Sequence, residues 1–299
     1  MSEKFSALQP DLVFASQGNL GISALAVLAA RRANLRCISY IPMAHSFRKM
    51  HSKYGRLRDW SNNYIVRIPD RWLTCTIEQI QKLRDQGAQQ PIDILPNCID
   101  LPQMATPSEA RGRLSLKIGD LVIGMVGRLN NVQKGCDLFI ETLNAAPKGS
   151  PLREAKLLFI GEGVDWGITR RQLEQNGWRG RILHLEWTGV PAEYLAAFDL
   201  LVMPSHFEGL PLSMQEAVLC NVPVAASAVD GLASFLPKNW LCAPNNSHAL
   251  LGLLENFIQD PDEYRKALPA LQQKIRNEHS TDAFHAALKK NFAATLHKM

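Results

Sequence analysis

The sequence predicts an α/β protein with parallel sheets. Short apolar runs that are typical of buried strands alternate with stretches of helical apolar spacing from residue 11 to residue 226. The first strand–helix–strand unit, residues 11–41, is long enough for a right-handed parallel crossover. The chain has 299 residues, 46% hydrophobic and 20% charged, as in an ordinary globular protein. This length allows two domains of about 100–200 residues each.

Two series of elements are expected along the chain. The first has strands at 11–16, 37–41, 72–76 and 92–95, with helices at 20–33 and 78–86. The second has strands at 121–126, 156–160, 182–185, 200–203 and 222–226, with helices at 137–143, 165–176, 192–197 and from Pro211 or Leu212 onward. From Ser247 the pattern is mostly helical.

This grouping predicts a domain division. We expect residues 1–104 to form an amino-terminal domain, the mixed and polar residues 105–119 to be a linker, and residues 120–280 to form a second domain. The last helix, residues 281–299, has apolar residues at helical spacing. It either crosses back onto the first domain or packs on its own domain.

Composition excludes several classes of protein. No run of about 18 apolar residues is present, so no transmembrane helix is expected. The amino terminus, MSEKFSALQPD, lacks the apolar region of a signal peptide, which predicts a cytoplasmic protein. The six cysteines contain no CxxC pair, so we expect reduced, mostly packed thiols.

Positive charge is concentrated in the first domain. Residues 1–104 carry 13 Lys and Arg against 8 Asp and Glu, whereas residues 105–299 carry 20 of each. Most of the excess lies in residues 48–71, where aromatic residues are interleaved with the cations. Such a segment suits an anionic membrane surface or an acidic acceptor, which would make the protein peripheral at the inner membrane face. The alternative is a solvated basic face over core aromatics. No base-reading motif accompanies the charge, so no nucleic-acid partner is predicted.

The first loop of the second domain, GMVGRLNNVQKG at 124–135, has the character of a phosphate site. Gly127 ends a strand and lets the backbone approach a ligand closely, while Arg128 and Lys134 supply cations that suit a diphosphate. The glycine spacing matches neither GxGxxG nor GxxxxGK[ST], which disfavours a dinucleotide enzyme or a P-loop NTPase. A second glycine turn begins at Gly161.

The stretch PSHFEGLPLSMQEA at 204–217 follows a buried strand and opens a helix. Glu208 and Gly209 therefore lie at the carboxyl end of a strand, where open α/β sheets bind ligands, beside a helix start that favours anions. Glu216 follows eight residues after Glu208. The pair suits a ligand with both hydroxyls and phosphates. The alternative is that both acids are ordinary residues favoured by the helix dipole.

One motif is interpreted as structural. Asp260-Pro261-Asp262 has a DxD pattern, which binds a metal ion in some enzymes. It lies between two helical stretches, where Asp260 suits a helix N-cap ahead of a proline. We therefore predict a cap and no metal site.

Taken in order, GRL…KG, FIGEG, the WTG turn at 187–189 and PSHFEGLPLSMQEA resemble the retaining glycosyltransferases of family 4. The resemblance extends over nearly all of residues 92–298. It implies the GT-B fold, with two Rossmann-like parallel-sheet domains facing a cleft. It also implies a nucleotide-diphosphate sugar as co-substrate, with no metal and no other cofactor.

The resemblance assigns roles to individual residues. Arg128 and Lys134 would hold the donor diphosphate, Glu208 the hydroxyls of the transferred sugar, and Glu216 the ribose hydroxyls. The remaining donor contacts would come from the backbone at Gly127, Gly161, Gly209, Leu210, Pro211 and Leu212. His45, after a strand of the first domain, would line the cleft near the reacting sugar. A loop histidine beside a basic segment is otherwise a surface residue.

The sequence departs from the family pattern in places. Cys98 and Asn221 stand where the family usually has glycine, and a glycine lost from a tight turn predicts a different backbone there. The family's opening glycine-rich loop and about 80–100 further residues are not found ahead of Asp11. We therefore expect an incomplete amino-terminal domain, with a partner chain completing it, or a misplaced start codon or split gene.

The sequence thus predicts a hexosyltransferase of the kind used in polysaccharide biosynthesis. It would move a hexosyl unit from a nucleotide-diphosphate sugar to a glycan or lipid-linked acceptor with retention and without metal. Two alternatives remain open: a donor-binding or regulatory subunit completed by a partner chain, and a GT-B sugar-nucleotide epimerase.

Overall fold

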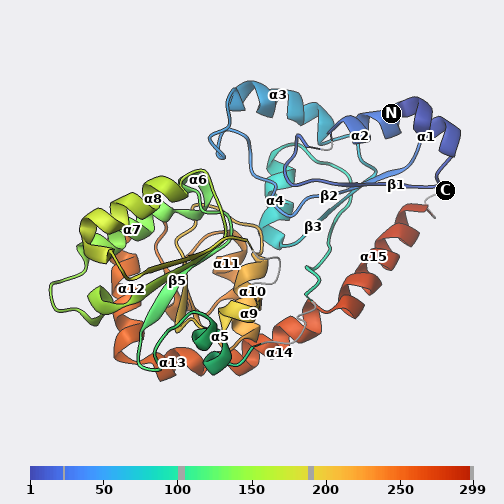
Figure 1. The fold of residues 1–299 in the computed structure, drawn as a ribbon. Helices are drawn as coiled ribbons and strands as arrows, with labels where there is room; N and C mark the ends of the chain where they lie inside the picture. Colours follow the sequence, from blue (N-terminus) through green and yellow to red (C-terminus); the bar gives the residue numbers. More distant parts are fainter. Residues whose placement is uncertain (23, 100–104, 188–191, 297–299) are drawn as a thin grey trace. The chain divides into compact units, whose positions relative to one another are not determined.

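The computed structural model describes residues 1–22, 24–99, 105–187 and 192–296. The chain divides into two compact units, each with its own sheet (Figure 1). Unit 1 comprises Met1–Cys98 and Glu278–Met299, and unit 2 comprises Ile99–Asn277. Every strand pair in the described residues is parallel.

Unit 1 is built on a four-stranded sheet in the order β1-β2-β3-β4. Its strands are β1 (Val13–Ser16), β2 (Cys37–Tyr40), β3 (Arg71–Thr74) and β4 (Ile92–Ile94). Its helices are α1 (Ser2–Leu8), α2 (Ala24–Arg32), α3 (Gly55–Ile65), α4 (Ile77–Asp85) and α15 (Thr281–Leu296).

The two faces of the unit 1 sheet have separate cores, because successive strand residues point to opposite faces. On one face Val13, Ala15 and Cys37 pack with Val27 and Ala30 of α2. On the other face lie Ile38, Leu73 and Leu95, packed with residues of α15: Phe284, Ala287, Leu288 and Phe292. The C-terminal helix therefore forms part of the core of unit 1 (Figure 1).

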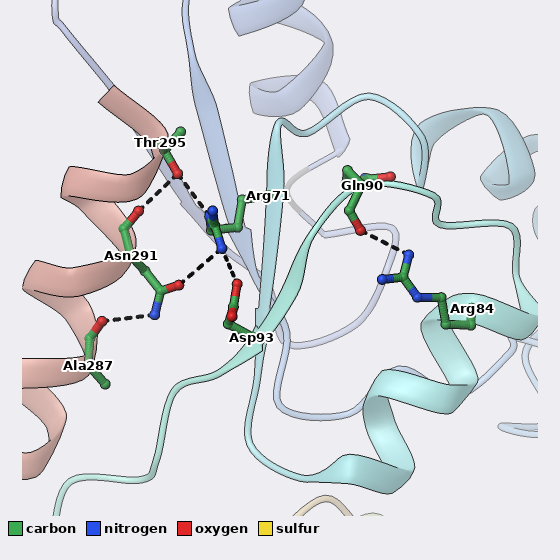
Figure 2. A network of polar contacts seen from close by, with 7 residues as sticks. All are labelled: Arg71, Arg84, Gln90, Asp93, Ala287, Asn291 and Thr295. Atoms are coloured by element: carbon green, nitrogen blue, oxygen red, sulfur yellow. Dashed lines mark hydrogen bonds and ion pairs between the residues drawn. The ribbon is translucent and has the colours of Figure 1, made fainter. Parts of the chain in front are cut away.

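A buried arginine joins α15 to the sheet. Arg71 of β3 is 8% exposed, and its guanidinium donates to Thr295 Oγ1 at 3.1 Å and to Asn291 Oδ1 at 3.4 Å. The same guanidinium forms an ion pair with Asp93 of β4 (Figure 2). Asn291 and Thr295 are themselves buried. The network therefore gives hydrogen-bond partners to the side chains of Asn291 and Thr295, whose burial without partners would destabilise the fold.

Unit 2 is built on a six-stranded sheet in the order β10-β9-β8-β5-β6-β7. Its strands are β5 (Val122–Val126), β6 (Lys156–Ile160), β7 (Ile182–Leu185), β8 (Leu200–Met203), β9 (Val224–Ser227) and β10 (Leu241–Cys242). Its helices are α5 (Pro107–Arg113), α6 (Asn131–Lys134), α7 (Cys136–Ala145), α8 (Trp166–Leu173), α9 (Ala192–Leu195), α10 (Leu212–Leu219), α11 (Asp230–Phe235), α12 (Ser247–Gln259) and α13 (Pro261–Arg265). Helix α14 (Leu268–Glu278) reaches the boundary with unit 1.

The strand order of unit 2 reverses at β5. The chain moves outward from β5 to β6 and β7, then returns to place β8 on the other side of β5. The order is that of a doubly wound Rossmann sheet, which opens a crevice at the carboxyl edge where the direction reverses. Loops that follow β5 and β8 lie at that crevice.

Five α-helices of the described residues lie where no helix is predicted: α1, α3, α5, α6 and α11. Helix α5 lies within residues 105–119, the predicted linker. It begins with a capping box between Thr106 and Glu109, and its Arg111 pairs with Asp199 at 2.7 Å. These residues are therefore packed into unit 2. Helix α3 lies within the basic segment 48–71.

The thiols are packed, as the sequence predicts. Five of the six cysteines are buried, all six are free, and Cys98 is exposed. Burial raises the pKa of Cys136 and of Cys220 to about 12, so these thiols stay protonated at neutral pH. In the described part of the chain, no helix is long and apolar enough to cross a bilayer.

Replacing the buried arginine should loosen α15. Arg71→Ala leaves Asn291 and Thr295 buried without their donor, and should lower the free energy of unfolding of unit 1 by about 2–4 kcal/mol. Urea denaturation measures the loss, and hydrogen exchange should show faster exchange along α15. The control is Arg265→Ala, whose exposed pair with Asp262 should contribute less than about 1 kcal/mol. Equal effects of the two substitutions would show that the network is dispensable.

Candidate functional site

The candidate site lies at the carboxyl edge of the unit 2 sheet, around the ends of β5 and β8. These strands are neighbours, with Ile123 aligned to Leu200. The loop after β5 carries Gly127, Arg128 and Lys134, and the loop after β8 carries Glu208. The strand order therefore brings two motifs from distant parts of the sequence to one crevice.

Glycines let the loops after β5 and β6 lie against each other. Gly127 and Gly161 have φ of 124° and 125°, a region that favours glycine. A Cβ on Gly161 would stand 2.1 Å from the carbonyl oxygen of Gly127, and one on Gly163 would stand 1.8 Å from that of Leu129. The backbones are joined by a bond from Leu129 N to the Glu162 carbonyl oxygen at 2.8 Å. No larger residue fits at either position without backbone movement.

The short helix α6 positions Lys134. Asn130 is its N-cap, and the Asn130 side chain accepts from the amides of Gln133 and Lys134. Gly135 ends the helix with φ of 66°, and a Cβ there would stand 2.2 Å from the Pro204 carbonyl oxygen. The cap and this close approach fix the direction in which Lys134 leaves the backbone.

Lys134 and Glu208 form a buried ion pair. Lys134 Nζ lies 2.6 Å from Glu208 Oε1, and the side chains are only 13% and 5% exposed. Ser205 Oγ donates to the same carboxylate oxygen at 2.8 Å, and Gln133 Nε2 donates to Oε2 at 3.3 Å. A Cβ on Gly127 would stand 3.9 Å from Lys134 Nζ, so the ammonium lies close to the backbone of Gly127. Three side-chain donors therefore contact the Glu208 carboxylate.

The backbone of the Glu208 turn is held by α11. Asp230 Oδ2 accepts from Glu208 N at 2.8 Å, and Gly231 N donates to the Gly209 carbonyl oxygen at 3.1 Å. Asp230 itself adopts a φ of 44°, which is uncommon for a residue with a Cβ. This turn is thus fixed by the neighbouring strand-to-helix connection as well as by its own sequence.

Helix α10 begins immediately after this turn. Pro211 is its N-cap and Leu212 its first residue, so the early amides of α10 have no partner within the helix. Pro211 has no amide hydrogen, so the predicted cradle of backbone amides can include Gly209, Leu210 and Leu212 but not Pro211. Glu216 is half-buried in α10, and burial raises the pKa of its carboxyl.

Arg128 and His45 differ in burial. The Arg128 side chain is exposed at the loop after β5. His45 belongs to unit 1, where it is 1% exposed and therefore is not a surface residue. Its loop is held by α4: Gln79 Oε1 accepts from Ala44 N at 2.7 Å, and Gln86 Nε2 donates to the Ala44 carbonyl oxygen at 2.6 Å.

Three further expectations have distinct outcomes. Asp260 caps α13, with its side chain accepting from Glu263 N at 3.1 Å, which confirms the structural interpretation of DPD. Asn221 has a φ of 62°, a left-handed conformation that asparagine tolerates. The expected change of backbone relative to the family stays a prediction. Most of the WTG turn, residues 188 and 189, lies outside the described residues.

Sequence reasoning did not identify the residues that support the site. Asn130, Gln133 and Ser205 flank the predicted residues, and Asp230 follows β9 at the same edge of the sheet. A signal for Asp230 was present, because it lies three residues after the end of β9, and the carboxyl edge of a parallel sheet is where ligands bind. Its hydrogen bond to Glu208 N depends on the turn geometry, which the sequence does not encode locally.

This architecture defines the class of fold. The chain is an α/β protein with two Rossmann-like parallel-sheet units, which matches its GT-B structural neighbours and confirms the predicted fold class. One neighbour is Anabaena HepE in complex with UDP and glucose, with a TM-score of 0.84 and 16% identity. The alignment covers 98% of this chain and 81% of that protein.

Part of the chain is similar to a known family. Residues 120–260 match the profile of Glycosyl transferases group 1. The chain is 28% identical to the 2-deoxystreptamine N-acetyl-D-glucosaminyltransferase of Streptomyces fradiae, over 85% of this chain and 61% of that protein. It is 26% identical to the UDP-Gal:alpha-D-GlcNAc-diphosphoundecaprenol alpha-1,3-galactosyltransferase of Escherichia coli, over 90% of this chain and 70% of that protein. The chain thus spans less than two thirds of the Streptomyces relative.

The buried Lys134–Glu208 pair leads to a prediction about the stability of unit 2. Lys134→Met leaves the Glu208 carboxylate buried without its cation, and should lower the free energy of unfolding by about 3–5 kcal/mol. Adding Glu208→Gln removes the stranded charge and should restore most of the loss, as measured by urea denaturation in a double-mutant cycle. The control is Arg113→Met, which breaks an exposed pair with Glu193 and should have an effect below about 1 kcal/mol. Additive effects of the two site substitutions would contradict the coupling.

Proposed function

We propose that the protein is a glycosyltransferase that moves a hexosyl unit from a nucleotide-diphosphate sugar to a glycan or lipid-linked acceptor, with retention and without metal. The observation that carries the proposal is the buried Lys134–Glu208 pair, 2.6 Å apart, at the switch point of a Rossmann sheet. A cation and a carboxylate held together there suit a ligand that carries both phosphates and hydroxyls. The match of residues 120–260 to Glycosyl transferases group 1 supports the same reading.

Unit 2 would bind the donor. Arg128 and Lys134 would neutralise the diphosphate, Arg128 through paired hydrogen bonds and Lys134 as a mobile point charge. Amides at the start of α10 would add to this neutralisation. The glycine backbones at 127 and 161 would let the diphosphate approach closely. Glu216 would accept hydrogen bonds from the ribose hydroxyls. These cations and amides would neutralise the departing diphosphate, as a metal ion does in metal-dependent enzymes.

Donor binding would rearrange the buried pair. When the ammonium of Lys134 turns to the diphosphate, the Glu208 carboxylate keeps Ser205 and Gln133 as donors. The hydroxyls of the transferred sugar would replace Lys134 as the third source of hydrogen bonds. Exchanging one set of partners for another avoids leaving a bare buried charge.

The reaction would proceed on the front face of the sugar. The bond from the anomeric carbon to the diphosphate oxygen breaks, and a bond to the acceptor oxygen forms on the same face. The acceptor proton passes to the departing phosphate oxygen, whose charge Arg128 and Lys134 stabilise. Glu208 would orient the sugar while its anomeric centre carries oxocarbenium character. In this scheme no enzymic nucleophile is needed.

The relatives support a sugar-nucleotide donor. One solved neighbour binds UDP and glucose, and the Escherichia coli relative is named as a UDP-galactose-dependent enzyme that acts on a lipid diphosphate. By analogy we propose a uridine or other nucleoside diphosphate for this chain, with an acceptor that is either a free glycan or linked to a lipid. Transfer to a lipid-linked acceptor would take place at a membrane surface.

The diphosphate assignment is tested by titration calorimetry. Arg128→Ala with Lys134→Ala should abolish detectable binding of the free nucleoside diphosphate, since both cations are lost. Lys148→Ala, an exposed cation of unit 2, is the matched control and should leave binding unchanged. A panel of nucleotide sugars then tests turnover, by hydrolysis and transfer. Tight binding by the double variant would refute the assignment, whereas wild-type binding without turnover would identify a donor-binding subunit.

Glu216 links binding to stability. Burial raises the folded-state pKa of the Glu216 carboxyl, so the native state keeps this proton to higher pH than the unfolded state does. The free energy of unfolding therefore falls as the pH rises from the unfolded-state pKa to the folded-state pKa. Glu216→Gln should therefore raise the melting temperature relative to wild type increasingly above about pH 4.5. The same variant should weaken nucleotide-sugar binding about 10-fold or more, through loss of hydrogen bonds to a charged acceptor. Unchanged calorimetric binding would exclude the ribose role.

A further inference from the structure

Helix α3 of unit 1 presents its apolar side outward. Leu57, Trp60 and Tyr64 are 63%, 71% and 69% exposed, and their spacing of three and four residues places them on one face of the helix. The buried residue of α3 is the polar Asn62. A surface helix of a globular protein normally has the reverse arrangement. We call the exposed side, with Leu57, Trp60 and Tyr64, the outer face of α3.

This orientation of α3 is fixed by polar contacts. Asp59 turns inward and accepts from the amides of Phe47 and Arg48, at 2.7 and 3.1 Å. Arg58 packs over the ring of Phe47, with Cζ 3.7 Å from the ring centre. At the helix end, Trp72 Nε1 donates to the Val66 carbonyl oxygen at 2.8 Å. The helix therefore cannot simply rotate to bury its apolar residues.

Apolar exposure continues onto the adjoining helix. Ile22, just before α2, is 65% exposed, and Leu25, in the first turn of α2, is 72% exposed. Helix α2 contacts α3. A Cβ on Gly21 would stand 3.1 Å from the Arg58 guanidinium, so this end of α2 lies against α3. Single exposed apolar residues are ordinary, but several on neighbouring helices mark an interaction surface.

The charge around the outer face is positive. Residues 48–71 carry seven Lys and Arg and two Asp. Both aspartates are engaged with backbone amides, Asp59 as above and Asp70 with Cys37 N at 2.7 Å. Of the cations, Arg67 and Arg71 bond within unit 1. Arg58 packs over Phe47. The other cations of the segment, Arg48, Lys49, Lys53 and Arg56, are exposed.

We propose that the outer face of α3 is a peripheral docking site for an anionic lipid bilayer. Trp and Tyr side chains suit the interfacial zone of a membrane, and exposed Lys and Arg add electrostatic attraction to anionic headgroups. A second copy of the chain is a poorer occupant, because a self-interface would bring cationic segments together. A helix of eleven residues with polar Asn62 toward the protein lies on a bilayer and does not cross it. Docking does not depend on the transfer reaction.

Vesicle flotation with the full chain tests the apolar contribution. Wild-type protein should float with vesicles of phosphatidylcholine and phosphatidylglycerol, and the variant Leu57→Ser, Trp60→Ser, Tyr64→Ser should bind at least about 10-fold more weakly. The control variant Ile118→Ser, Val164→Ser changes apolar residues of unit 2 that are 96% and 89% exposed, and should bind as wild type. All of these side chains are exposed, so folding should be retained.

A second variant tests the electrostatic contribution. Lys49→Gln, Lys53→Gln, Arg56→Gln should weaken binding by about fivefold for each cation removed, whereas the control Lys148→Gln, Arg179→Gln, in unit 2, should not. Salt of about 1 M should weaken wild-type binding, and pure phosphatidylcholine should bind poorly.

Absence of wild-type flotation, or equal loss in the control variants, would overturn the proposal. A concentration-dependent dimer in sedimentation velocity that is lost with Trp60→Ser would instead assign the outer face to self-association. Nucleoside diphosphate binding, measured by calorimetry, should be unchanged in every variant of the outer face. Membrane docking and donor binding can therefore fail independently.

Discussion

The ion pair between Lys134 and Glu208 is the interaction on which the candidate site depends. It joins the loop after β5 to the loop after β8, across the point where the strand order reverses. A buried ion pair is a poor source of stability, because desolvation of both charges offsets much of their attraction. A pair kept at such a position makes better sense as preorganisation for a ligand. In the proposed function, phosphates would then become the partners of the ammonium and sugar hydroxyls those of the carboxylate.

Backbone proximity is the condition that allows this pair to form. The loop after β5 lies against the loop after β6 at Gly161 and Gly163, and against the end of β8 at Gly135. Each contact leaves no room for a Cβ, so the positions are fixed by sterics and not by flexibility. The glycines therefore have two functions, since they let loops approach one another and also keep the crevice open to a bulky, charged ligand.

The sequence was sufficient for the parts of this structure that follow from local pattern. Strands 156–160, 182–185 and 200–203 were predicted with the bounds that β6, β7 and β8 have, because buried parallel strands are short continuous apolar runs. Helix α3 is not among the predicted helices, because residues 48–71 were interpreted by their charge and their interleaved aromatic residues alone. The contacts of Glu208 with Lys134, Ser205 and Asp230 could not be predicted, because they depend on tertiary geometry and on turn conformations such as the positive φ of Asp230.

The two units differ in the chemical character of the residues that they expose or concentrate. Unit 2 concentrates buried charge and glycine backbone at one crevice, which suits a soluble, multiply charged donor. Unit 1 has cations and exposed aromatic residues on α3 instead, which suit a surface that is both anionic and apolar. The buried Arg71 network holds α15, the end of the chain, in the core of unit 1. If both proposals hold, donor affinity and surface attachment would depend on different residues and could be altered separately, as a transferase with a lipid-linked acceptor would require.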